Sequence, residues 1–211
     1  MNAEHPETLT SSTSLPLSLG AWLTAEPARS EIGDQTREGE ASRILQAADA
    51  ILAQAEVLLQ TLSAENYTLK VPVAFNASIG GHLRHCLDHF SSVVRSESGS
   101  LVNYDQRERD ARIESDLDFA LGVTRDLRRK LALISPAELH HAVAARCEVS
   151  YSCGSSPITA SSLGRELVYC IAHAIHHYAL IAVMARLQGT QLPENFGIAP
   201  STVAHQQAIH A

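Results

Sequence analysis

Histidines occur in two short windows of the chain, at spacings that suit metal binding. The sequence has 11 histidines in 211 residues, and six of them fall within 82–89 and 173–177. His173 and His177 are four residues apart, so on a helix their imidazoles lie on one face, one turn from each other. Such a pair lets one helix supply two nitrogen ligands to one ion. The histidines of the other window recur at i, i+3 and i+7 and are His82, His85 and His89.

Two nitrogens from one helix and a third from a neighbouring helix would form a metal site with open positions. Three protein ligands leave room for water or substrate, whereas structural sites are closed by four. Imidazoles suit zinc, nickel, iron or copper, and the sequence does not decide among these divalent transition metals. Taken singly, His82, His89 and His176 are each interpreted as partly buried histidines whose partners are backbone groups or carboxylates.

Two carboxylates lie within reach of the histidine windows. Glu166 stands seven residues before His173 on the same helical line, so we predict a catalytic role for it, as a general base or as an acceptor that orients an imidazole. Asp88 could orient an imidazole in the same way. An alternative is that His85, Asp88 and His89 form the H-x-x-acid-H order of inverted zinc peptidases, in which the acid is the base.

The segment after the second histidine helix contains cations and an aromatic residue that suit an anionic substrate. Arg107 and Arg109 could form bidentate hydrogen bonds with a carboxylate, and Tyr104 lies next to them. We therefore predict substrate binding by these three residues. The alternative is a solvated charged loop in which the arginines pair with nearby acids, namely Asp105, Asp110, Glu114 and Asp116.

Hydrophobic periodicity predicts the helices that must position these groups. Four amphipathic stretches recur at helical spacing, and they cover about 41–65, 78–95, 117–135 and 161–188. Ser78 is a predicted N-cap, as is Ser161 or Ser162, and a short last helix is expected after Pro200. Between 137 and 160 the helical periodicity stops, and we expect either a short hairpin or an irregular excursion there. The fold class is therefore all-α, a four-helix bundle.

Composition divides the chain and limits its partners. Residues 1–40 are rich in Ser, Thr, Glu, Gly and Pro, which predicts a disordered leader. The bundle is expected to cover 41–205, and a short tail 206–211. A net charge of −7 argues against nucleic-acid binding by phosphate neutralisation.

Residues 167–185 contain no Asp, Glu, Lys or Arg over about the length that crosses a membrane. Three histidines interrupt this stretch, so we expect a bundle helix and no membrane. The four cysteines show no C-x-x-C spacing, so we expect reduced thiols in the cytoplasm.

Specific segments resemble the DinB/YfiT-like superfamily of bacterial metal-binding bundles. These are Ser78-Ile-Gly-Gly-His-Leu-Arg-His85, the helix from His173 to Ile181 and the four-helix order, over about 41–205. The resemblance implies a divalent metal held by His85, His173 and His177, and often a homodimer. Many members follow the last ligand with Arg-Gly-Gln-Ile, whereas this chain has Tyr178-Ala-Leu-Ile181. The run from Tyr104 to Asp110 and the segment Asn195–Thr202 resemble an uncharacterised bacterial branch of the superfamily.

The resemblance implies a range of activities that includes hydrolases and thiol-dependent transferases. Our leading hypothesis is a metal-dependent enzyme in which the ion activates water or a low-molecular-weight thiol, with a small-molecule substrate. A second hypothesis is a non-catalytic metal-binding or stress-related bundle, with a side chain such as Glu166 or His89 filling the open positions. A third is a purely structural bundle.

Overall fold

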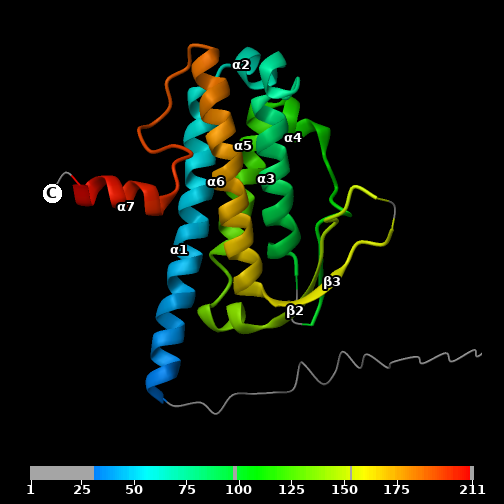
Figure 1. Cartoon of the computed structure of the whole chain (residues 1–211), viewed down its shortest axis with the longest axis vertical. Coiled ribbons are helices and arrows are strands. Elements are labelled where there is room, and N and C mark those ends of the chain that lie inside the picture. The colour runs from blue at the N-terminus through cyan, green and yellow to red at the C-terminus, as the bar shows by residue number, and fades with distance from the viewer. Residues whose placement is uncertain (1–30, 97–98, 153, 210–211) are drawn as a thin grey trace, which may run out of the picture.

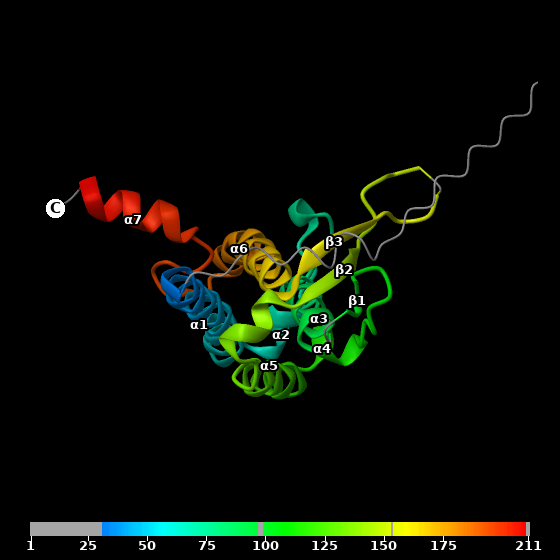
Figure 2. The same ribbon diagram turned by 90° about the horizontal axis from the view of Figure 1, so that it is seen from below.

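The computed structural model describes residues 31–96, 99–152 and 154–209, and it is mainly helical. The longest helices are α1 (Glu31–Thr61), α3 (Ile79–Val94), α5 (Leu117–Leu131) and α6 (Leu163–Leu187). They lie side by side, with the small sheet across one end (Figures 1 and 2). Shorter helices are α2 (Ala64–Thr68), α4 (Ala111–Ser115), α7 (Pro200–Ile209) and two 3-10 turns at Pro72–Ala74 and Pro136–His140.

The predicted helices agree with the structure for α3, α5 and α6, as do the predicted caps of α3 and α6. The Ser78 hydroxyl accepts from the Gly81 N–H at 3.1 Å, and the Ser162 hydroxyl accepts from the Arg165 N–H at 3.2 Å, so both serines close a helix N-terminus. Helix α1 begins at Glu31 rather than near residue 41, so it enters the segment expected to be a disordered leader. The rest of that leader, residues 1–30, lies outside the described residues.

A three-stranded sheet is the main departure from an all-α fold. Strands β2 (Ala142–Arg146) and β3 (Ile158–Ser162) form the antiparallel hairpin that was one of the two expectations for 137–160. Strand β1 (Leu101–Asn103) pairs in parallel with β2, and no sequence pattern predicted it. The sheet matters for the site because β1 leads into Tyr104 and Arg107, and β3 leads directly into α6.

The core lies between the four long helices. Each contributes apolar side chains that are almost fully shielded from solvent, including Leu52 of α1, Leu83 and Phe90 of α3, Leu127 of α5 and Leu167 of α6. Helix α3 packs against α6, and both also contact the rest of the core. This packing fixes the two histidine-bearing helices next to each other.

Helix α6 is long and apolar enough to cross a membrane, with a mean hydropathy of 1.6. It also packs against α1 and α3, and its buried residues belong to the common core. A core helix passes the same test of length and composition, so this helix is weak evidence for a membrane span.

Candidate metal centre

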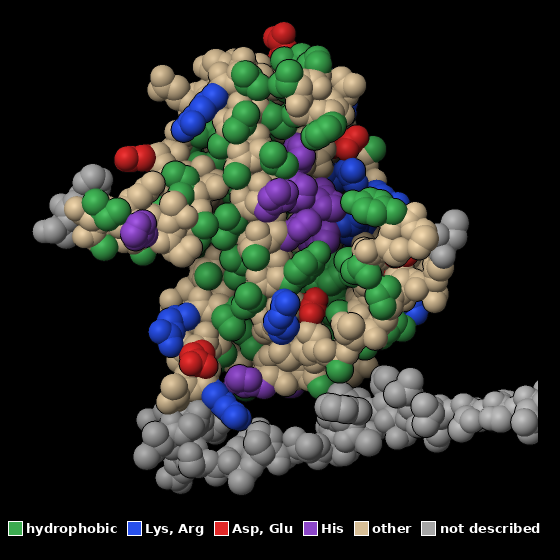
Figure 3. All heavy atoms as spheres, in the orientation of Figure 1, with side chains coloured by type: hydrophobic (Ala, Val, Ile, Leu, Met, Phe, Trp, Pro, Cys, Tyr) green, Lys and Arg blue, Asp and Glu red, His purple; other side chains and the backbone are tan. Residues whose placement is uncertain are grey.

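Histidines from α3 and α6 meet in one cluster, which is exposed on one face of the molecule. In Figure 3 their side chains gather over the middle of these helices, with Lys and Arg side chains beside them. The predicted triad of His85, His173 and His177 can offer one ligand atom each, all within 4.8 Å of one another. The structure thus places together the three residues that the resemblance singled out, and their donor set suits a divalent ion.

The ring nitrogens of these imidazoles are close enough to contact one another directly. His85 Nε2 lies 2.8 Å from His173 Nε2. The ring centroids of His85 and His177 are 4.7 Å apart, and those of His173 and His177 are 4.6 Å apart. Three imidazoles therefore surround one small volume, which is the arrangement that a shared ion requires.

Two further side chains contact ring nitrogens of the triad. His82 Nδ1 lies 2.9 Å from His177 Nδ1, and Arg107 Nη1 lies 3.2 Å from His85 Nδ1. An outer contact orients a ligand imidazole when it accepts the second ring N–H, which His82 can do, whereas the Arg107 guanidinium can only donate. His82 was interpreted as a histidine with backbone or carboxylate partners, whereas its partner is a histidine of the triad.

His89 also belongs to the cluster. It is 3% exposed, its ring centroid lies 4.4 Å from that of His173, and its Nε2 contacts Arg107 Nη1. Tyr104 stacks on the other side of its ring, with the centroids 4.9 Å apart. Its partners differ from the backbone or carboxylate groups expected for it. His176, by contrast, is exposed at the edge of the cluster, next to His177.

Burial keeps the clustered imidazoles neutral. Desolvation is the main cause that lowers the pKa of His85 to about 4, of His177 to about 3 and of His89 to about 2. Repulsion from neighbouring imidazoles acts in the same direction, and Arg107 adds to it at His85 and His89. The pKa values of His82 and His173 are lowered too, again mainly by desolvation. A neutral imidazole has the free lone pair that a metal ion needs.

Glu166, the predicted catalytic residue, contacts a tyrosine and a serine instead of an imidazole. It is 6% exposed and accepts hydrogen bonds from the Tyr104 hydroxyl, at 2.7 Å, and from the Ser161 hydroxyl. The Tyr104 hydroxyl also lies 3.9 Å from Cys170 Sγ. Burial is the main cause that raises the pKa of Tyr104, so this hydroxyl remains protonated and donates. Tyr104 thereby connects Glu166 to His89.

The two predicted substrate arginines lie in different surroundings. Arg107 is half-buried and contacts His85 and His89, so it does lie at the histidine cluster. Arg109 is exposed, has a left-handed backbone with φ 50°, and makes no hydrogen bond or ion pair with a described residue. Of the acids expected as alternative partners, Asp110 pairs with Arg112 and Glu114 with Arg84.

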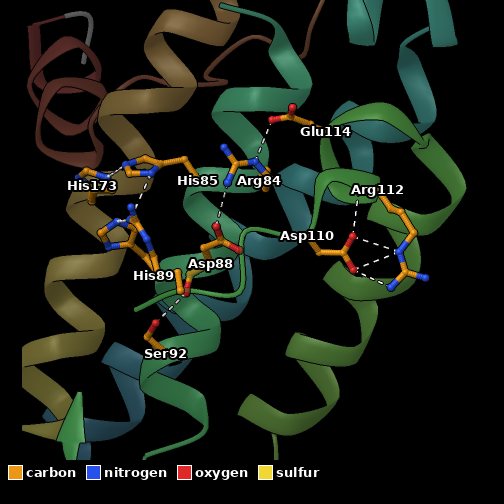
Figure 4. A network of polar contacts seen from close by, with 10 residues as sticks. Arg84, His85, Asp88, His89, Ser92, Asp110, Arg112, Glu114 and His173 are labelled. Atoms are coloured by element: carbon orange, nitrogen blue, oxygen red, sulfur yellow. Dashed lines mark hydrogen bonds and ion pairs between the residues drawn. The ribbon is translucent and has the colours of Figure 1, made fainter. Parts of the chain in front are cut away.

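Asp88 is directed away from the neighbouring histidines of its own helix. Its Oδ2 lies 3.3 Å from Arg84 Nη1, and Arg84 also pairs with Glu114 at 2.9 Å. Figure 4 shows these ion pairs on one side of α3, with His85, His89 and His173 on the other. This arrangement gives no support to Asp88 as the base of an inverted peptidase site.

Comparison with known proteins leaves the family of this chain unassigned. No family model matches the chain, and no solved structure matches it. FK506-binding protein 5 of Rhizopus delemar is 36% identical over 124 residues, which make up 56% of this chain. The match spans 31% of the fungal protein's length. The chain is thus similar to one part of a longer protein, and the resemblance to the DinB/YfiT-like superfamily stays a prediction.

Proposed function

We propose that this chain is a metal-dependent enzyme whose helices α1, α3, α5 and α6 form a four-helix bundle of the DinB/YfiT-like type. A divalent transition metal would be bound by His85, His173 and His177. The observation that carries the proposal is that three neutral, half-buried imidazoles from two helices offer ligand atoms within 4.8 Å of one another.

A divalent ion, when bound, supplies Lewis acidity that lowers the pKa of a coordinated water or thiol. That chemistry fits hydrolysis or the transfer of a low-molecular-weight thiol. The chain's own contribution is orientation, because His82 contacts Nδ1 of His177 and can accept its N–H. Glu166 is a positioning residue in this proposal, since it acts on the cluster through Tyr104 and His89.

Arg107 gives the site a preference for anionic substrates. Its guanidinium is half-buried beside the imidazoles and forms no ion pair with a described residue. A carboxylate would supply the paired acceptor that this cation lacks. We therefore assign the substrate to small carboxylate-bearing molecules, among which a thiol would fit the transferase alternative.

The test is cobalt substitution followed by titration with a small thiol. Co²⁺-loaded protein is expected to change its visible spectrum when β-mercaptoethanol is added, because a thiolate would enter an open coordination position. The His173→Ala variant serves as the ligand-loss control and is expected to show no such spectrum. A cobalt spectrum that neither thiol nor azide changes would contradict an open, catalytic site.

A closed, non-catalytic metal site is the second candidate, and His89 favours it. The His89 ring centroid lies 4.6 Å from that of His85 and 4.4 Å from that of His173, so a fourth imidazole adjoins the triad. Four nitrogen ligands would complete a tetrahedral structural site. In that case the His89→Ala variant, unlike the wild type, would respond to the added thiol.

A further inference from the structure

Helix α7 (Pro200–Ile209) projects from the bundle and is exposed along nearly its whole length. None of its residues is buried, and Val203 is half-buried. In Figures 1 and 2 the helix points away from α1 and α6. A helix of 10 residues is marginal in water on its own, because helices in proteins gain most of their stability from tertiary packing. Helix α7 therefore calls for a surface to pack against.

The base of α7 is fixed, so the bundle sets the direction in which this helix points. Phe196 is 6% exposed and stacks on Tyr178 of α6, with the ring centroids 4.9 Å apart. Gly197 follows in a left-handed conformation with φ 74°, and a Cβ there would lie 2.6 Å from the Tyr178 carbonyl oxygen. Glycine is the residue that permits this turn against α6. The turn holds α7 away from its own bundle.

The composition of α7 suits a packed helix better than a solvated one. It contains no Asp, Glu, Lys or Arg. Pro200, Val203, Ala204 and Ala208 recur at i, i+3, i+4 and i+8, so they share one face of the helix. An apolar face of this kind normally lies against another element. Within the described residues, nothing buries this face.

A groove beside the base of α7 offers a surface of matching character. It has a volume of about 380 Å³ and is lined by one face of α1 and by the turn 193–196. Ala50, Ala53 and Val57 form the α1 wall, and Val57 is 42% exposed. Of the residues that line this α1 groove, Glu194 alone is charged. An apolar, uncharged helix face is therefore a better match for the groove than a charged ligand is.

The position of the α1 groove indicates that its occupant comes from a second copy of the chain. The turn 193–196 is one wall of the groove, and α7 begins shortly after it, but Gly197 directs α7 away. A two-fold axis beside the groove would bring the α7 of each copy to the groove of the other. A net charge of −7 opposes association elsewhere on the surface, whereas α7 and the groove are almost uncharged.

We propose that α7 is an exchange arm. Its apolar face packs into the α1 groove of a second copy, and the arm of that copy fills the groove of the first, which forms a two-fold dimer. None of the clustered histidines lines the groove, so the interface does not depend on a metal ion.

The test is sedimentation equilibrium of the 211-residue chain, treated with EDTA so that exposed histidines cannot bridge two copies through a metal. We expect a dimer with twice the 22.8 kDa mass of one chain. Val57→Asp in the groove and Val203→Asp on the arm should each raise the dissociation constant of the dimer by about tenfold or more, because a buried charge replaces an apolar contact.

Val168→Asp is the matched control for the groove variant. Val168 is also 42% exposed, but it lies on α6 and does not line the groove, so its variant should dimerise like the wild type. Circular dichroism confirms that each variant is folded.

Crosslinking between copies assigns the dimer to arm exchange. Chains that carry Val203→Cys are mixed with chains that carry Val57→Cys and treated with a short bifunctional maleimide. We expect a covalent dimer of the two variants that wild-type chains do not form under the same conditions. A monomer at about 100 μM chain, a dimer that either aspartate variant leaves intact, or the absence of this crosslink would overturn the proposal.

Discussion

Arg107 is the residue whose contacts bear most directly on metal affinity. Its Nη1 donates to His85 Nδ1 and also contacts His89 Nε2. A guanidinium this close to the triad repels a second cation, since unscreened charges a few ångströms apart interact strongly in a half-buried site. It also engages the Nδ1 lone pair of His85, which favours a proton on Nε2, the nitrogen that faces His173, so this contact competes with metal binding by His85.

We predict that Arg107→Met raises the affinity for Zn²⁺ by about tenfold, because it removes this repulsion. Competition against a chromophoric chelator measures the change. Arg95→Met is the matched control, since Arg95 directly follows α3 and pairs with Glu108 away from the histidines. A weaker affinity in Arg107→Met would show that Arg107 supports the ion through His85 instead of opposing it.

Tyr104 provides a second test at this scale. Tyr104→Phe removes the hydroxyl that donates to buried Glu166, so the free energy of unfolding should fall by about 1–3 kcal/mol. Zinc affinity should stay within about twofold, because neither residue belongs to the ligand triad. Urea denaturation and chelator competition measure the two quantities. Tyr151→Phe is the control, because Tyr151 is fully exposed. Equal stability of the two variants would contradict the buried hydrogen bond between Tyr104 and Glu166.

Some of the site was predictable from residue types and spacing. The i, i+4 pair His173 and His177 indicated a metal pair, and the resemblance added His85. The contact of His82 with His177 was not predictable, because its partner is 95 residues away on another helix. Periodicity shows which residues share a helix face, but not which faces meet.

At the scale of elements, α3 is held against α4 by a close backbone approach at Gly80. A Cβ at this position would lie 2.3 Å from the Glu114 carbonyl oxygen and 2.9 Å from Tyr67 Cε1. Real atoms do not approach this closely, so a side chain at Gly80 would force α3 and α4 apart. The α3 histidines would then move relative to α6.

We predict that Gly80→Ala lowers the free energy of unfolding by about 3 kcal/mol. Gly122→Ala on α5 is the control, since a Cβ there meets nothing within 4 Å. That variant should be equally stable or more stable by up to about 1 kcal/mol, because alanine favours a helix over glycine. Urea denaturation of both variants checks the pair. Similar losses in both would contradict the close approach.

The meeting of α3 and α6 also makes stability depend on pH. The pKa values of His85, His89 and His177 are lowered in the folded state, so the unfolded chain binds more protons below a pH of about 6.5. Above that pH these histidines are neutral in both the folded and the unfolded state, and their contribution to the free energy of unfolding is complete. As the pH falls toward the folded pKa values, this contribution is lost. Each such histidine weakens stability by up to about 1.4 kcal/mol per pH unit in this window.

We therefore expect metal-free protein to be less stable at pH 5.5 than at pH 7.5, about one unit either side of the unfolded histidine pKa. Urea denaturation with EDTA at both values measures the difference. His89→Gln should reduce it, whereas His176→Gln, at an exposed position, should leave it unchanged. A difference that His89→Gln does not alter would contradict the burial of a neutral His89.

The elements themselves were predictable to different degrees. Helices α3, α5 and α6 follow from amphipathic periodicity, with predicted Ser caps at α3 and α6, and these signals are local. Strand β1 has three residues and pairs in parallel with β2 some forty residues later, so no local pattern marks it. The start of α1 at Glu31 was obscured by the polar residues of its first turns.

For the whole molecule, the histidine cluster lies where α3 and α6 pack together, with Arg107 beside it. The long helices bring residues from distant parts of the chain to α3, and the sheet positions Tyr104 and Arg107 beside it. The proposed superfamily membership rests on the motifs around His85 and His173 and on the helix order.

Elemental analysis tests the metal centre most directly. The 211-residue chain is purified without a tag or a chelator. The His173→Ala variant and the control variant His176→Ala are purified in the same way. We predict about one transition metal ion per chain in the wild type and the control, and its loss in His173→Ala with unchanged helicity. Equal metal content in all three proteins, or none in the wild type after reconstitution, would contradict a metal centre at His85, His173 and His177.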